Sequence, residues 1–332
     1  MTGEKTYRAL VAEESGGEFR QIVKELSLDN LPDHDVLVRV HYSSLNYKDA
    51  LSASGNRGIT KNYPHTPGVD AAGIVEESRD SRFRAGDKVI VTSYDLGMNT
   101  PGGFGEYIHV PGDWIVPLPD SLTLKESMMI GTSGLTAAMG LEKIVSQHIQ
   151  PKKGSVLVTG ATGGVGSFAV ALLSHLDFKV IAVTGKPDLK EWLLNIGAAD
   201  VISRKDVTAV PGKPLLSSRW IAAIDTVGGT MLDAVIRQTD HNGVVTCCGN
   251  VLGHKLETSI YPFILRGVSL MGIDSGIALM ADRKRIWNRL AADWKLPVLD
   301  IVASTCSLEE LPGEISKILN GKQIGKKVIS HL

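Results

Sequence analysis

The sequence predicts a two-domain α/β protein in which a β-rich part is joined to a doubly wound parallel sheet. Three observations support this: a length of 332 residues, strand-like alternation in the first third, and alternating apolar strands and amphipathic helices after it. We expect residues 1–123 and 276–332 to form one domain and residues 124–275 the other.

The first part has the texture of short strands separated by turns. Residues 36–42 alternate apolar and polar side chains, and residues 88–92 form an apolar run after a Gly-Asp turn. Between them, residues 63–68 contain two prolines and a glycine, which punctuate strands. These features predict a compact β-rich domain.

The second part alternates regularly between strands and helices. We expect strands at residues 155–160, 179–184, 200–203, 220–226, 244–247 and 269–273, and helices at residues 126–141, 167–176, 188–196 and 230–238. This alternation is typical of a doubly wound parallel sheet. A polar helix over residues 281–294 and a strand-like tail at 327–329 follow; the tail cannot extend a completed sheet, so we assign it to the first domain.

Composition restricts the classes of function. A formal net charge of −1 argues against a nucleic-acid or anionic-membrane partner, and no apolar run is long enough to span a membrane. The first five residues lack a signal-peptide pattern, and three cysteines are too few for a disulfide framework. We therefore expect a cytoplasmic protein that acts on a small molecule.

A glycine-rich loop joins the first strand of the second part to the next helix. Such a loop lets backbone N–H groups approach a pyrophosphate, and the helix N-terminus favours its negative charge. The alternative is a tight strand–helix turn that binds no ligand. The loop lies within a complete strand–helix–strand unit, and this context favours the nucleotide-binding interpretation. The expected cofactor contacts here are Ala161, Thr162, Gly163, Gly164, Val165 and Gly166.

The ends of the next two strands indicate which dinucleotide binds. An acidic residue there would select NAD by accepting hydrogen bonds from the ribose, but the sequence has Thr184 and Lys186 instead. Arg204 follows the third strand and suits a bidentate phosphate contact. The alternative is that both cations are solvated loop charges. The missing acid and the two cations favour NADPH.

Several motifs together resemble the medium-chain dehydrogenase/reductase superfamily over essentially the whole chain. The phrases Leu-Asn-Tyr-Lys-Asp, Gly-Ala-Thr-Gly-Gly-Val-Gly-Ser, Pro-Phe-Ile-Leu-Arg and Gly-Ile-Asp-Ser are similar to the YhdH/YhfP-type quinone oxidoreductases, which include acrylyl-CoA reductases. The resemblance implies a GroES-like β-rich catalytic domain and a Rossmann-type cofactor domain. It also implies a homodimer that extends the cofactor sheet edge-to-edge around residues 269–273.

The residues depart from the zinc enzymes of this superfamily. Those enzymes place a cysteine where Asn46 stands and a His-Glu pair where Val69 and Asp70 stand, and residues 93–106 contain no cysteine for a structural zinc. Zinc sites need thiolate, imidazole or carboxylate ligands in a closed set, so we expect no metal. The zinc-free relatives reduce activated double bonds: hydride goes to the β-carbon and a proton to the α-carbon.

The expected catalytic residues are Tyr47, Asn46 and Asp274. The phenol of Tyr47 is placed to bind the substrate carbonyl or donate the proton; packing under the cofactor is the alternative. Asn46 would supply an amide donor, and Asp274 either relays a proton or anchors a loop. The resemblance and the strand order add further cofactor contacts, with helix capping as the alternative for the two threonines: Thr132, Thr136, Gly249 and Asn250.

The leading hypothesis is an NADPH-dependent reductase of acrylyl-CoA or another small 2-enoyl-CoA. The nearest alternative is reduction of quinones or free enones with the same cofactor, and the alternative of another class is a non-catalytic NADPH-binding redox sensor. A thioester enzyme needs cations for the CoA phosphates, and residues 283–285 or Lys326 with Lys327 are the candidates; solvated charge is the alternative for both.

Overall fold

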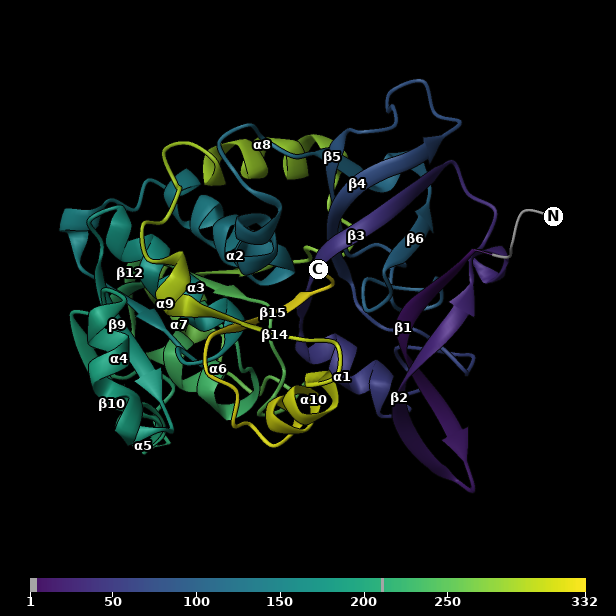
Figure 1. The fold of residues 1–332 in the computed structure, drawn as a ribbon. Helices are drawn as coiled ribbons and strands as arrows, with labels where there is room; N and C mark the ends of the chain where they lie inside the picture. Colours follow the sequence, from purple (N-terminus) through teal and green to yellow (C-terminus); the bar gives the residue numbers. More distant parts are fainter. Residues whose placement is uncertain (1–4, 210–211) are drawn as a thin grey trace. The chain divides into compact units, whose positions relative to one another are not determined.

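The computed structural model describes residues 5–209 and 212–332, and its strands form three sheets (Figure 1). The N-terminal residues that bear on a signal peptide lie partly outside this range. Contacts divide the chain into two compact units. Unit 1 contains Met1–Thr132, Gly276–Ala292 and Ala303–Leu332, and unit 2 contains Ser133–Ser275 and Asp293–Val302. The boundaries predicted from sequence, at 123/124 and 275/276, differ from this division: they place residues 124–132 in the second domain and residues 293–302 in the first. The predicted domain boundaries stay a proposal.

Unit 1 is built from a two-stranded ribbon and a seven-stranded sheet. Its sheet has the order β14-β15-β3-β4-β5-β7, and β6 pairs with β3. The strands are β1 (Thr6–Ser15), β2 (Glu18–Ser27), β3 (Val36–Leu45), β4 (Asp70–Ser78), β5 (Lys88–Thr92), β6 (Tyr107–Val110), β7 (Ile115–Pro117), β14 (Ala303–Cys306) and β15 (Lys326–Ser330).

The alternating residues of β3 explain how this sheet buries one face. Val36, Val38 and Val40 are buried, whereas Arg39 between them is exposed. The C-terminal strand β15 pairs antiparallel with β3, with Lys327 opposite Leu45. The tail of the chain is therefore part of the β-rich unit, beside a strand almost 300 positions earlier in sequence.

Unit 2 contains a six-stranded parallel sheet. The order is β10-β9-β8-β11-β12-β13, which reverses between β8 and β11. Ligands bind at such a switch point, outside the carboxyl ends of the strands. The strands are β8 (Ser155–Val158), β9 (Lys179–Thr184), β10 (Asp200–Ser203), β11 (Trp220–Asp225), β12 (Thr239–Cys247) and β13 (Ser269–Gly272).

The helices agree with the predicted pattern in type and differ at their ends. Helix α3 begins at Gly164, three positions before the predicted start, because the glycine loop itself forms the first turn. The predicted helix at 188–196 begins as a 3₁₀ turn, which Pro187 opens, before α4. The helices are α1 (Tyr47–Ala53), α2 (Leu124–Ser146), α3 (Gly164–His175), α4 (Lys190–Asn195), α5 (Arg204–Thr208), α6 (Gly229–Arg237), α7 (Tyr261–Arg266), α8 (Met280–Leu290), α9 (Leu299–Val302) and α10 (Leu311–Leu319).

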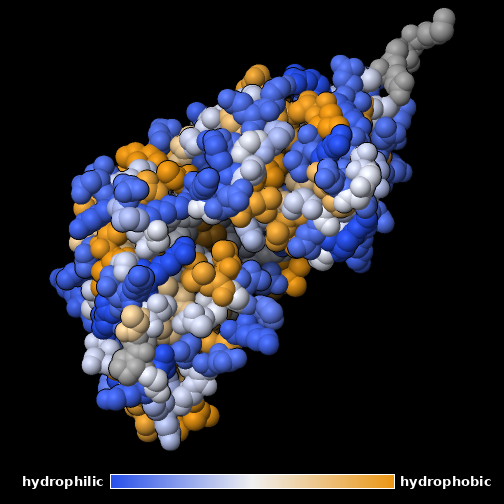
Figure 2. All heavy atoms as spheres, turned by 90° about the horizontal axis from the view of Figure 1, so that it is seen from below, coloured by the Kyte–Doolittle hydropathy of each residue, from blue (hydrophilic) through white to orange (hydrophobic). Residues whose placement is uncertain are grey.

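The surface agrees with a balanced composition. On the face drawn in Figure 2, hydrophilic residues cover most of the area and hydrophobic side chains gather in separate patches. None of the helices in the described part of the chain combines the length and the apolar character that crossing a membrane requires.

Candidate active site

The glycine loop lies at the carboxyl end of β8 and opens directly into α3. Gly163 is the N-cap of this helix, and its backbone N donates to Gly160 O at 2.9 Å. Ala161 is buried, and its backbone N donates to Val183 O at 3.2 Å, which ties the loop to β9. The first N–H groups of a helix have no partner within the helix, and an anion is favoured beside them.

Two glycines of this loop are required by close approach. A Cβ on Gly166 would lie 2.2 Å from Gly160 O, and Gly160 itself has a φ of +59°. Any side chain at residue 166 would push α3 away from the strand end. The loop is therefore held in one compact shape, as a pyrophosphate site requires.

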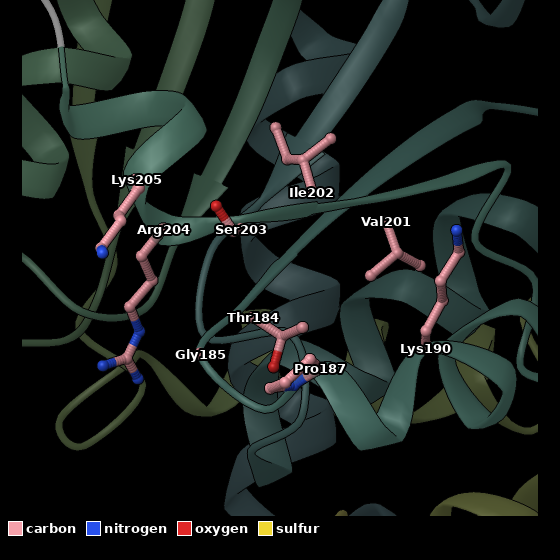
Figure 3. A pocket seen from close by; sticks show the side chains of 9 residues that line it. All are labelled: Thr184, Gly185, Pro187, Lys190, Val201, Ile202, Ser203, Arg204 and Lys205. Atoms are coloured by element: carbon pink, nitrogen blue, oxygen red, sulfur yellow. The ribbon is translucent and has the colours of Figure 1, made fainter.

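A pocket of about 510 Å³ lies beyond the ends of β9 and β10 (Figure 3). Its lining contains three cationic side chains and, in the described part of the chain, no acidic one. The lining residues are Thr184, Gly185, Pro187, Lys190, Val201, Ile202, Ser203, Arg204 and Lys205. Sequence reasoning identified Thr184 and Arg204 but missed Lys190, which begins α4, and Lys205, in the first turn of α5.

The guanidinium of Arg204 packs against the backbone of Gly185. A Cβ at residue 185 would lie 2.8 Å from Arg204 Cζ, so this contact depends on glycine. Figure 3 shows the Arg204 side chain beside Gly185, on the same side as Lys205. Burial and the positive charge of Arg204 lower the pKa of Lys186. Two cations held this close are typical of a site that binds an anion.

The remaining predicted cofactor residues are spread over both units. Gly249 and Asn250 follow β12, and Thr136 bonds through its hydroxyl to that of Ser275 at 2.6 Å. Asp274 lies just beyond β13 and is exposed. In unit 1, the Thr132 hydroxyl donates to Asp70 Oδ1 at 2.5 Å.

Asn46 is part of a buried polar cluster in unit 1. It lies between β3 and α1 and is 9% exposed. Its Oδ1 accepts from Lys326 Nζ at 2.5 Å, while its Nδ2 donates to Asp70 Oδ2 at 2.8 Å and to Asp49 Oδ2 at 3.2 Å. An ammonium can only donate and a carboxylate can only accept, so these partners fix the orientation of the amide.

Asp70 carries most of the hydrogen bonds in this cluster. Ser44 Oγ donates to it at 2.6 Å, and Lys326 Nζ lies 3.4 Å from its Oδ2. Burial by itself would raise the pKa of Asp70, but Lys326 and the hydrogen bonds of Ser44, Thr132 and Asn46 outweigh it and hold the pKa below its ordinary value. Asp70 is therefore the ionised partner of a fully buried ion pair.

Asp49 caps the helix that presents Tyr47. Its Oδ2 accepts from Asn46 N at 2.7 Å and its Oδ1 from Val69 N at 2.8 Å. Burial and the nearby Asp70 raise the pKa of Asp49 to about 7. Tyr47 is the first residue of α1 and is 37% exposed. The buried cluster therefore supports the turn from which this tyrosine reaches the surface.

The residues of this cluster do not suit zinc. They offer carboxylate and amide oxygens, with neither thiolate nor imidazole among the described partners of Asn46 and Asp70. The Lys326 ammonium already supplies the positive charge that Asp70 requires and would repel a divalent cation. No group of three His, Cys, Asp or Glu side chains in the described ranges is arranged to hold a metal ion.

The structure corrects the expectation for the CoA phosphates. Arg283 is fully buried, and its guanidinium donates to Thr92 O at 3.0 Å and to Gly276 O at 2.7 Å. Lys326 is also buried, as described above. Long cationic side chains look alike in sequence whether they are solvated or bonded internally, and here two of the proposed phosphate contacts are internal.

Two other buried residues escaped prediction as functional candidates. Asp225 ends β11 at the switch point, and Asp70 begins β4 in the cluster of Asn46. For Asp225 the available signal was an acid at the carboxyl end of a parallel strand, whereas Asp70 begins a strand of the antiparallel sheet and has no such signal.

Comparison with known proteins places this fold. The alcohol dehydrogenase GroES-like domain family matches residues 32–120, and the zinc-binding dehydrogenase family matches residues 164–291. YhfP of Bacillus subtilis, whose name assigns it provisionally to the quinone oxidoreductases, is 44% identical, with 97% of this chain and 98% of that protein covered. The acrylyl-CoA reductase AcuI of Ruegeria pomeroyi is 40% identical, with 97% and 98% covered.

A solved structure agrees with these relatives. The YhdH oxidoreductase of Salmonella enterica, in complex with NADP, matches with a TM-score of 0.95 and 39% identity, covering 98% of this chain and all of that one. The fold and the site define a medium-chain dehydrogenase/reductase with a GroES-like domain and a Rossmann-type parallel sheet. Within that superfamily, the chain belongs to the family of YhdH, YhfP and AcuI oxidoreductases.

Proposed function

We propose that this protein is an NADPH-dependent reductase of activated carbon–carbon double bonds. The observation that carries the proposal is the cationic pocket beyond β9 and β10, which has no acidic lining residue. It suits the 2′-phosphate of NADPH and offers no carboxylate to accept hydrogen bonds from an unphosphorylated ribose. The name of the Salmonella relative, a complex with NADP, supports the same cofactor.

The proposed cofactor site combines the glycine loop with this pocket. The loop and the N-terminus of α3 would hold the pyrophosphate, while Lys186 and Arg204 would bind the 2′-phosphate. Gly249, Asn250, Thr132 and Thr136 would contact the nicotinamide half. NADPH, when bound, supplies the hydride, and the protein must place the substrate, stabilise the enolate and provide a proton.

Gly185→Ala tests the phosphate contact through the side chain that it displaces. A Cβ at residue 185 meets the Arg204 guanidinium, so we expect the Kd for NADPH to rise about tenfold and the Kd for NADH to change little. Gly313→Ala adds the same methyl group where no atom lies within 4 Å and is the control. Equal losses of NADPH and NADH would contradict the assignment.

Tyr47 is the proposed substrate-binding residue or proton donor. Its exposed phenol lies at the start of α1, whereas the amide hydrogens of Asn46 are used by Asp49 and Asp70. We therefore propose that Asn46 orients this turn and does not bind the substrate. Asp274 remains a candidate for proton relay. Tyr47→Phe and Asp274→Asn should each lower kcat with little effect on the affinity for NADPH.

The proposed substrate is acrylyl-CoA or a similarly small 2-enoyl-CoA, because the AcuI relative with this name covers nearly the whole chain. A quinone or a free enone is the second candidate, which the name of YhfP favours. Steady-state oxidation of NADPH with acrylyl-CoA, crotonyl-CoA and 1,4-benzoquinone separates them. Saturable turnover of acrylyl-CoA supports the first; turnover of quinone alone moves the assignment to the second.

A non-catalytic NADPH sensor is the alternative from another class. It predicts stoichiometric NADPH binding without turnover of any enoyl-CoA, enone or quinone. The exposed Tyr47 above a buried, fully bonded cluster supports the catalytic proposal instead, because a sensor has no need to hold a phenol in place.

We also propose that the protein is a cytoplasmic homodimer formed at β13. This strand is the edge of the six-stranded sheet, and apolar side chains near it are exposed: Ile260 by 63%, Ile264 by 62% and Leu265 by 57%. Unpaired edges with apolar neighbours are typical of interfaces. Ile264→Glu should halve the mass measured by light scattering, whereas Ile324→Glu should not. An unchanged mass for both would contradict the interface.

A further inference from the structure

Asp225 is a buried acidic residue to which the proposed cofactor contacts assign no role. It is the last residue of β11, and its exposed fraction is 0%. β11 lies beside β8 at the point where the strand order reverses. Burying a carboxylate is costly unless hydrogen bonds compensate, so its presence at a ligand-binding edge requires an explanation.

The carboxylate of Asp225 joins two strand-end loops. Its Oδ1 accepts from Thr159 Oγ1 at 2.7 Å, and its Oδ2 accepts from Gly228 N at 2.7 Å. Thr159 directly precedes Gly160 of the glycine loop, and Gly228 has a φ of +71° in the turn after β11. Thr159 Oγ1 also accepts from Thr226 N at 3.0 Å. One side chain therefore fixes the start of the glycine loop and the turn beside it.

The loop after β12 is attached to the same residues. Cys248 N donates to the backbone O of Asp225 at 3.1 Å. A Cβ on Gly249 would lie 1.8 Å from Thr226 O, and a Cβ on Gly160 would lie 2.3 Å from Thr226 Oγ1. The three loops are packed without spare room, so a shift of one displaces the others.

Both carboxylate oxygens of Asp225 act as hydrogen-bond acceptors. Burial raises the pKa of this carboxyl, and the bonds from Thr159 and Gly228 oppose that rise by favouring the charged form. An asparagine has nearly the same shape but only one acceptor oxygen: if that oxygen keeps the bond from Gly228 N, the N–H₂ group faces Thr159 Oγ1, whose own proton then loses its acceptor. Asp225→Asn therefore weakens the link between the loops without leaving a cavity.

We propose that Asp225 is a positioning residue whose carboxylate holds these three loops in the shape that binds the pyrophosphate and the nicotinamide half of NADPH. The proposal rests on the function proposed above and assigns a role to a residue that lies beneath the loops. The adenosine half has its own pocket beyond β9 and β10, so the two halves of the cofactor should respond differently to a change at Asp225.

The test compares Asp225→Asn with Asp177→Asn, which makes the same chemical change on an exposed carboxyl between α3 and β9. NADPH and adenosine 2′-monophosphate, which lacks the pyrophosphate and the nicotinamide half, are titrated against each protein. For Asp225→Asn we expect the Kd of NADPH to rise about tenfold, the effect of one lost hydrogen bond to a charged group. The Kd of the monophosphate should change less than about twofold, and Asp177→Asn should match the wild type for both ligands.

Thr159→Val supplies a second variant with the same expected pattern, because it removes one donor to the carboxylate and conserves volume. The double variant should show less than the sum of the two single effects. Unchanged NADPH affinity in both single variants, or equal loss of both ligands, would show that Asp225 only supports the fold.

Hydrogen exchange of the ligand-free protein separates this proposal from the proposed function. Peptides that cover residues 226–229 and 248–252 should exchange faster in Asp225→Asn than in Asp177→Asn. If the wild type binds neither ligand but this difference is present, the proposed function is wrong while the loop-holding role stands. If exchange is unchanged, the positioning role is wrong whatever the ligand binding.

Discussion

At the scale of the residue, the buried cluster of unit 1 concentrates charge around the turn that carries Tyr47. Lys326 and Asp70 form an ion pair in which both side chains are buried, and Asn46 bridges them to Asp49. Such a pair contributes little net stability compared with apolar residues, but breaking it leaves an uncompensated charge. Its value lies in fixing one arrangement of the turn.

Lys326→Met should lower the free energy of unfolding by about 3–5 kcal/mol, because it leaves the carboxylate of Asp70 buried without a cation. Urea denaturation measures this. Lys317→Met, which removes an exposed lysine paired with Glu314, should leave stability nearly unchanged. A similar small effect for both variants would mean that Asp70 finds another partner or becomes protonated.

The raised pKa of Asp49 predicts how stability depends on pH. A carboxyl whose pKa is higher in the folded than in the unfolded protein binds more protons when folded, so stability falls as pH rises between the two values. Between about pH 4 and the folded pKa of about 7, the contribution of Asp49 to the free energy of unfolding should decline by at most about 1.4 kcal/mol per pH unit. Buried histidines such as His331, whose pKa burial lowers to about 4, act in the opposite direction, so urea denaturation at pH 5, 6, 7 and 8 compares the wild type with Asp49→Asn. The difference in stability between the two proteins should fall as pH rises; a difference that grows would contradict this.

At the scale of the element, helix α2 is interrupted at Gly131, where φ is +49° and ψ is −160°. A Cβ there would lie 2.6 Å from Asp70 Oδ2 and 2.7 Å from Ser44 Oγ. Gly131 is therefore required for two reasons: it adopts the backbone conformation that breaks the helix, and it leaves room for the side chains of the buried cluster. This is a position where helix propensity is overruled by tertiary contact.

Gly131→Ala should therefore destabilise the protein by more than about 2 kcal/mol, whereas alanine is ordinarily the better helix former. The thermal unfolding midpoint measures the effect. Gly140→Ala, later in the same helix, is the comparison and should be milder, because the nearest atom to its Cβ would be Thr246 Oγ1 at 3.2 Å. Equal or improved stability of Gly131→Ala would show that the kink straightens without harm to the Asp70 cluster.

At the scale of the whole molecule, the proposed NADPH contacts lie in unit 2, apart from Thr132. Saturating NADPH, at about 100 times its Kd, should raise the free energy of unfolding by about 2.7 kcal/mol, and NADH at the same concentration should raise it less. Thermal unfolding with each cofactor measures this. Equal stabilisation by both would contradict 2′-phosphate recognition.

Hydrogen exchange should locate the same effect. We expect protection by NADPH in peptides that cover residues 160–166, 184–186 and 202–205, and none in the β1–β2 ribbon. Protection confined to other segments would move the cofactor site.

The sequence by itself determined the fold class, the strands β9 and β10 to the residue, and the glycine loop. These are local features: apolar runs, glycines and cations keep their meaning over a few positions of chain. The family resemblance, carried by short motifs in order, was confirmed by the relatives. The sequence also shows that no acidic residue directly follows β9, which is the observation that favoured NADPH over NADH.

Only the tertiary structure decided which charged residues are buried and with which partners. Lys326 and Asn46 are separated by 280 positions, and the three loops around Asp225 come from strands spread over about 90 residues. Lys326 and Arg283 have the sequence pattern of surface cations, yet both are bonded internally. A pattern along the chain records exposure and periodicity, but the partner of a buried polar group is chosen by the packing of distant elements.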